Sequence, residues 1–224
     1  MTEAKKLGRI VGALLVVQIV LAIPVYTEIG MMRAVIAPGF LHIAAADAAK
    51  IRLALLLVAL LGTITLLMAL VSWPLFRRYS ERLALAYVGL SLAGIACELI
   101  EATVVRTMVN MSIVYTRGEV AAPVLEALTR PTRAAWSSAH FSNLLLGHVK
   151  NMVLFIILMR FRFVPRALAG FGVAAAVLAA TAAVLALLGQ PFRYPLIMPA
   201  GLVTASLAVW LVVRGFRPAN VGDR

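Results

Sequence analysis

Cysteine and acidic residues are scarce in this chain of 224 residues, and each shortage narrows what the protein can be. Cys97 is the only cysteine, so the chain cannot form an internal disulfide. Asp and Glu together number 9 against 21 Lys and Arg, which gives a formal net charge of +12. The basic residues punctuate apolar runs and form no stripe with interleaved aromatic residues, so we expect no nucleic-acid partner.

Hydrophobic residues make up 63% of the chain, well above the roughly 45–50% of ordinary soluble domains. A soluble core cannot hold this excess, so much of it must face the lipid bilayer. Six apolar runs have close to the ~20 residues that a helix needs to cross a hydrocarbon layer. The sequence therefore predicts an all-α bundle of six transmembrane helices in a single domain, residues 1–224. The expected spans are residues 10–32, 51–73, 83–110, 135–159, 167–188 and 196–213.

The basic residues between the runs predict the orientation of the bundle. Twelve lie on the side of the two chain ends and seven on the other side. Short loops rich in Lys and Arg stay preferentially in the cytoplasm, so we expect both termini there (N-in, C-in). The larger set is Lys5, Lys6, Arg9, Arg77, Arg78, Arg82, Arg160, Arg162, Arg166, Arg214, Arg217 and Arg224. The smaller set is Arg33, Lys50, Arg52, Arg117, Arg130, Arg133 and Arg193.

Two long connections fall on the outer side, at residues 33–50 and 116–134. We expect a short interfacial helix in the first and a short amphipathic helix at residues 120–128 in the second. The third run can continue to Tyr115, which would make a helix of roughly 50 Å at 1.5 Å per residue. Such a helix must tilt, break or project from the membrane.

Glu98 and Glu101 lie inside the third apolar run and are the most informative polar residues of the chain. A carboxylate at membrane depth costs roughly 2.5–3.5 kcal/mol even on lenient insertion scales, so it needs a wet cavity or a partner. The two residues are three apart and share one helix face. Two close carboxylates in a medium of low dielectric constant are not both charged cheaply, so we expect one to hold a proton.

The fourth run supplies the expected partners. His140, Asn143, Gly147 and Asn151 are spaced by three and four residues, which places them on one helix face with His148 beside it. We expect Gly147 to let a neighbouring backbone approach, as small residues do in membrane helices. Two facing polar stripes would line a cavity in the outer half of the bundle.

Other charged residues complete the set of candidates. Arg106 is expected at the outer interface or paired with Glu101 or Glu119, and Lys150 is expected off the polar face of its helix. Glu28 falls near the outer end of the first run. The candidate ligand-binding residues are Glu98, Glu101, His140, Asn143, His148, Asn151, Arg106 and Glu28.

Aromatic and small residues carry weaker signals. The tryptophans and two tyrosines near the span ends are expected to anchor the helices at the membrane interface. They are Trp73, Trp136, Trp210, Tyr79 and Tyr194. Gly8 and Gly12 form a GxxxG motif in the first run, which is a common helix-packing motif.

Three interpretations of the polar cluster remain open. The side chains can neutralise one another and only fix helix packing. Alternatively, they line a pocket of a non-enzymatic membrane protein that binds a small or lipidic ligand, a membrane-protein partner or a second copy of the chain. A third alternative is a membrane enzyme or redox protein with a metal, haem or quinone at Glu98, Glu101, His140 and His148. The chain lacks an HxxxH or HExxH pair, so no metal site is predicted and no cofactor is assigned.

Several short motifs resemble one known family. They are Asp47 with Arg52, Leu75-Phe76-Arg77-Arg78, Leu83-Ala84, the stretch from Val164 to Gly170, and the stretch from Trp210 to Gly215. Together they resemble the bacterial multi-pass membrane family called domain of unknown function four-three-eight-six. The resemblance implies a helical membrane fold and a bacterial cytoplasmic (inner) membrane location, and it implies no chemistry. Family members often carry an acidic residue in the last span, whereas Pro199 to Trp210 here contains only Thr204 and Ser206 as polar side chains.

Overall fold

The computed structural model describes residues 2–26 and 30–217, and six of its helices are long and apolar enough to cross a membrane. The predicted all-α membrane bundle with six spans is therefore confirmed. The described part also contains two short helices and one 3-10 turn, and no strand. The spans are α1 (Glu3–Tyr26), α4 (Ala48–Phe76), α5 (Glu81–Arg117), α6 (Ala122–Arg160), α7 (Arg166–Leu187) and α8 (Met198–Arg214). The short elements are α2 (Arg33–Ile36), α3 (Phe40–Ile43) and η1 (Tyr194–Leu196).

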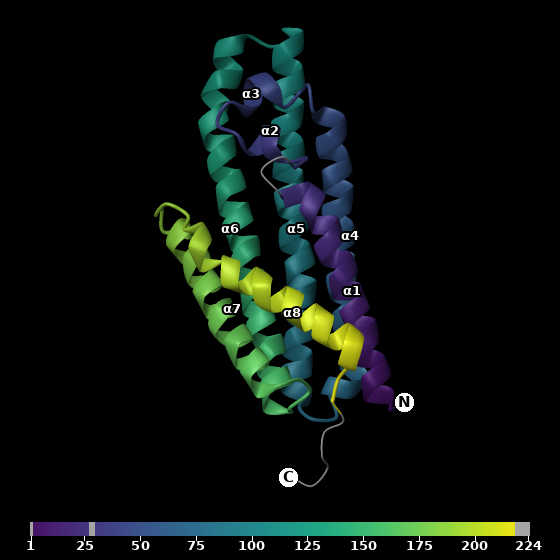
Figure 1. Ribbon diagram of the computed structural model, residues 1–224. Helices are drawn as coiled ribbons and strands as arrows, with labels where there is room; N and C mark the ends of the chain where they lie inside the picture. Colours follow the sequence, from purple (N-terminus) through teal and green to yellow (C-terminus); the bar gives the residue numbers. More distant parts are fainter. Residues whose placement is uncertain (1, 27–29, 218–224) are drawn as a thin grey trace.

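The six long helices form a closed ring in the order α1, α4, α5, α6, α7, α8, and each packs against its two neighbours (Figure 1). The ring closes where α8 crosses α1. Gly8 and Gly12 lie at this crossing, and a Cβ on either would overlap Leu211 or the backbone from Val212 to Phe216. The GxxxG motif therefore has the packing role that the sequence predicts.

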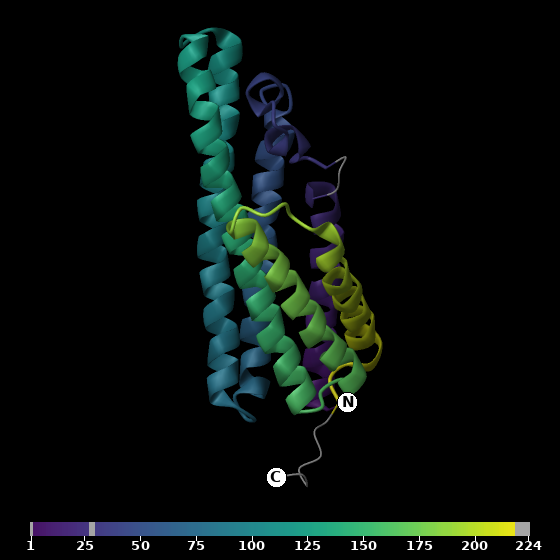
Figure 2. The ribbon, with the colours of Figure 1, turned by 90° about the vertical axis from the view of Figure 1, so that its left-hand side faces the viewer.

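The two ends of the ring differ in charge. One end holds the start of α1, the end of α8 and the turns α4–α5 and α6–α7 (Figures 1 and 2). Within the described residues this end carries many cations against the acidic residues Glu3 and Glu81, so we call it the basic end. We call the opposite end, where α5 turns into α6, the hairpin end. The cations are Lys5, Lys6, Arg9, Arg77, Arg78, Arg82, Arg160, Arg162, Arg166, Arg214 and Arg217.

Helices α5 and α6 are roughly 55 and 58 Å long at 1.5 Å per residue, and their hairpin extends past the α7–α8 connection (Figure 1). Exposed side chains on α5 change from apolar at Ile100 to polar at Thr103 and Arg106. On α4 the same change separates Arg52 from Leu53. A hydrocarbon layer of about 30 Å, measured from the start of α5, ends at this level. The α5–α6 hairpin extends beyond this level, which we call the polar boundary.

The prediction of a loop at residues 116–134 is wrong, because most of this segment is helical. Helix α5 ends at Arg117 and is followed by Gly118, which has a left-handed φ of 66° that favours glycine. Helix α6 already begins at Ala122, with Pro123 in its first turn, where a missing N–H is harmless. Residues 120–128 therefore form the turn and the start of α6 rather than a separate amphipathic helix.

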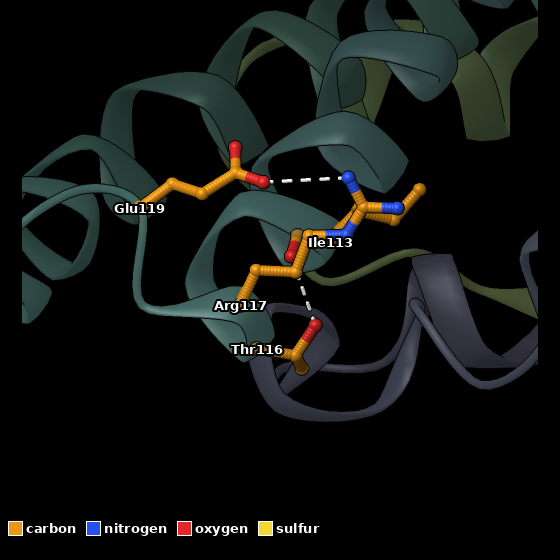
Figure 3. Close-up of polar contacts among 4 residues, drawn as sticks. All are labelled: Ile113, Thr116, Arg117 and Glu119. Atoms are coloured by element: carbon orange, nitrogen blue, oxygen red, sulfur yellow. Dashed lines mark hydrogen bonds and ion pairs between the residues drawn. The ribbon is translucent and has the colours of Figure 1, made fainter.

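Polar contacts hold the tip of the hairpin together (Figure 3). Arg117 Nη1 lies 3.3 Å from Glu119 Oε1, and the Thr116 hydroxyl donates to the Ile113 carbonyl at 2.9 Å. Both charged side chains of the pair are exposed, so it contributes at most about 1 kcal/mol. The tip is therefore shaped by its backbone turn more than by this ion pair.

The connection between α1 and α4 folds over the hairpin end, where the sequence predicts a short interfacial helix. It contains two short helices, α2 and α3. The Ala45 N–H donates to the buried Ser112 hydroxyl of α5 at 2.8 Å. Arg133 of α6 donates to the carbonyls of Ile36 and Ala37 at 2.8 and 2.7 Å. These bonds fix the connection against both helices of the hairpin.

Two separate apolar cores result. The first lies toward the basic end and includes Phe76 and Leu158. The second lies toward the hairpin end and includes Phe40 and Met108. Along α5 the buried residues of the two cores are separated by the segment that carries Glu98 and Glu101. The predicted polar stripe is thus a layer between two apolar cores.

Candidate functional site

Glu101 of α5 is the centre of the polar layer. Its Oε1 lies 2.8 Å from Nδ1 of His140, and its Oε2 accepts a hydrogen bond from Asn143 Nδ2 at 3.0 Å. The side chains of Glu101 and His140 are 16% and 27% exposed, so this contact is largely shielded. The prediction that α5 and α6 are neighbours joined through these polar faces is confirmed.

Trp136 of α6 covers the far side of this pair. Its ring stacks on the His140 imidazole, with 5.1 Å between centroids and 17° between planes. The residue lies one helical turn before His140, so the stack follows from helix geometry. The sequence interpretation assigned Trp136 only an anchoring role, and its spacing from His140 was the signal that could have identified it.

Glu98 lies one turn below Glu101 and presents an unsatisfied acceptor. Its Oε2 is buried and has no hydrogen-bond partner among the described residues. Gly62 of α4 lies against this carboxylate, so closely that a Cβ at position 62 would collide with Oε2. Gly62 is the small residue that admits a polar neighbour, and nothing local in the sequence of α4 marks it for this role.

A small cavity adjoins the two carboxylates. Glu98, Glu101, His140, Trp136 and Tyr26 line it, together with apolar side chains of α2, α4 and α5. The volume of this cavity is about 20 Å³. A water molecule needs roughly 10–15 Å³ by this measure, so the cavity accommodates one small polar group.

Lys150 corrects the sequence interpretation. It was expected off the polar face of α6. It lies seven residues after Asn143, which is nearly two full helical turns, so the two residues lie on the same side of α6. No hydrogen bond joins Lys150 to Glu98, whose buried Oε2 has no partner among the described residues. At 1.5 Å per residue, Lys150 lies roughly 10 Å nearer to the basic end than Asn143.

His148 and Asn151 are not part of the Glu101 cluster. Both ring nitrogens of His148 are buried without a partner among the described residues. His148 lies midway between Phe141 and Phe155, seven residues from each, and Phe155 packs on Gly172 of α7. This spacing places His148 on the α7 side of α6. Asn151 is half-buried and makes no side-chain hydrogen bond within the described part of the chain.

Three further expectations have different outcomes. Gly147 has no atom within 4 Å of the position of a Cβ, so its expected role in helix approach is wrong. Arg106 is exposed on the hairpin side of the polar boundary, and Glu119 pairs with Arg117 instead. Glu28 lies outside the described residues.

No group of three or more His, Cys, Asp or Glu side chains suited to a metal ion occurs in the described part of the chain. The site instead combines the hydrogen-bonded carboxylate of Glu101, the carboxylate of Glu98, which is unpaired among the described residues, and the aromatic rings of Tyr26 and Trp136.

Comparison with known proteins gives one match. A family model described as Domain of unknown function (DUF4386) matches residues 10–215. No curated protein and no solved structure matches the chain. The matched range includes all the polar residues of the site.

Substitutions at Glu98 test whether this residue is neutral in the ligand-free protein. Glu98→Gln is expected to keep the free energy of unfolding within about 0.5 kcal/mol of wild type, because the amide resembles the protonated acid and can hydrogen-bond. Glu98→Ala is expected to lower it by about 1–3 kcal/mol, because it empties the space beside Gly62. Unfolding of both variants is measured in the same detergent. If Gln proves as damaging as Ala, Glu98 is charged and paired.

Proposed function

The chain belongs to the DUF4386 family, whose description assigns no activity. We therefore propose a function from the geometry of the site. The protein binds the polar head of a small or lipidic ligand in the cavity beside Glu98 and Glu101. The observation that supports this most strongly is that Glu98 lines the cavity and makes no side-chain hydrogen bond among the described residues, with its Oε2 buried against Gly62. Buried acceptors in proteins are nearly always paired with a donor, so a ligand that donates a hydrogen bond completes the site.

The position of the cavity favours an amphiphilic ligand. Its carboxylates lie at the polar boundary, where lipid headgroups meet the hydrocarbon layer. Tyr26 lines the cavity and is 53% exposed, so the lining reaches the surface of the bundle. A ligand at this depth can place its head against Glu98 and keep an apolar tail in the membrane.

The polar layer does not continue to the basic end. Beyond Asn151, the buried side chains of α6 are apolar and include Leu154 and Leu158. They belong to the first core, which also includes Phe163 and Phe216 near the basic end. This arrangement supports a binding site open from one side rather than a path through the bundle.

The protein resides in the cytoplasmic membrane of a bacterium, with the basic end inside. The charge difference between the two ends of the bundle supports this orientation. The ligand would then reach the cavity at the level of the outer leaflet.

Gly62→Ala tests the binding function. The added methyl group displaces the Glu98 carboxylate, so we expect at least tenfold less bound ligand, a loss of about 1.4 kcal/mol in binding. The protein is purified in a mild detergent, and molecules that remain bound are identified and quantified by mass spectrometry. Gly94→Ala is the matched control, because nothing lies within 4 Å of a Cβ at position 94 of α5. Binding fails as a function if wild type carries no molecule or if Gly62→Ala retains as much as Gly94→Ala.

Reporter fusions test the orientation. A reporter after residue 224 is expected to be active in the cytoplasm, and one inserted at Gly118 in the hairpin turn is expected to be active outside, because the basic end stays in the cytoplasm. Cells expressing each fusion are assayed with a pair of reporters active in opposite compartments. Finding both positions on the same side would contradict the six-span topology.

A further inference from the structure

We propose that the ligand head bound at Glu98 is a primary ammonium group, −NH₃⁺, of an amine or an aminolipid. This inference rests on the proposed binding function and specifies the class of ligand. It follows from three properties of the cavity: its size, the balance of charge around it, and its aromatic lining.

Size limits the head to one small group. The cavity volume is about 20 Å³, which is enough for a group such as a hydroxyl or a primary ammonium. A trimethylated ammonium is several times larger than a water molecule and does not fit. A phosphate is also too large, and it would face two carboxylates.

The hydrogen-bonding groups favour a donor that carries charge. Both oxygens of Glu101 are already engaged by His140 and Asn143. Glu98 lines the cavity without a hydrogen-bond partner in the described part, with its Oε2 buried against Gly62, and no hydrogen bond joins it to Lys150. An ammonium donates up to three hydrogen bonds and accepts none, so it can donate to the Glu98 carboxylate and leave no acceptor of its own unpaired in the otherwise largely apolar cavity. It can also replace the proton that we expect on one of the two carboxylates.

The aromatic residues add a second attraction for a cation. Tyr26 and Trp136 line the cavity on either side of the glutamates in the ring, from α1 and α6. Aromatic rings attract ammonium groups through their quadrupole, most strongly for tryptophan. A hydroxyl head would gain the hydrogen bond to Glu98, but it would gain neither the attraction to the carboxylate charge nor the attraction to the aromatic rings.

The experiment compares amphiphiles that share one tail. Purified full-length protein in a non-ionic detergent is titrated with decylamine, decanol or decyltrimethylammonium at pH 7, and the midpoint of thermal unfolding is recorded. Wild type is expected to bind decylamine at least tenfold more tightly than the other two probes. Glu98→Gln is expected to lose this preference, because the amide keeps the hydrogen bond but not the charge. Lysophosphatidylethanolamine and ethanolamine then distinguish a lipid from a free amine, with lysophosphatidylcholine as the control for the lipid.

Each outcome decides the proposal. An amine preference that disappears in Glu98→Gln supports it, whichever amine source binds more tightly. Equal responses to decylamine and decyltrimethylammonium overturn it, since they would show only an effect of a cationic detergent. A preference for decanol, or a decylamine response unchanged in Glu98→Gln, also overturns the ammonium class but leaves the binding function intact. If no probe acts and Gly62→Ala retains as much bound material as Gly94→Ala, the ligand class and the binding function fail together.

Discussion

The two hydrogen bonds that Glu101 accepts from α6 are the interaction on which the described architecture depends. A carboxylate at this depth is expensive unless its oxygens are satisfied, and His140 and Asn143 satisfy one oxygen each. Because both partners belong to α6, the bonds fix the register of α5 against α6 at one level. The long hairpin continues beyond this level, and the contacts of the α1–α4 connection with Ser112 and Arg133 depend on that register.

The same layer separates two apolar cores that meet different surroundings. The core toward the basic end is enclosed by all six spans, whereas the core toward the hairpin end is built from the end of α1, α4, α5, the start of α6 and the α1–α4 connection. The exposed side chains change from apolar to polar close to Glu101. The polar layer thus coincides with the polar boundary, and Glu98, one turn deeper, is left with a buried oxygen unpaired in the described part. A site that needs a donor therefore forms where headgroups are present.

Much of this could be predicted from local sequence. Apolar runs of membrane length identified the six spans, and the expense of Glu98 and Glu101 within one run predicted partners on the next helix. What the sequence did not reveal depends on contacts between distant segments. Gly62 has a role only because α4 packs against Glu98, and Tyr26 joins the cavity only because α1 ends at that level. The hairpin was mistaken for a loop because Gly118 and Pro123 suggest one, yet Pro123 in a first turn starts a helix.

The most direct test of the central claim is a double-mutant cycle between Glu101 and His140. Glu101→Ala, His140→Ala and the double variant are unfolded in the same detergent, and the exposed pair Arg117 and Glu119 serves as the control cycle. A partly buried, hydrogen-bonded pair that fixes two helices predicts a coupling of about 0.5–3 kcal/mol, larger than in the control. A coupling near zero, or one no larger than that of Arg117 and Glu119, would contradict the role given to Glu101.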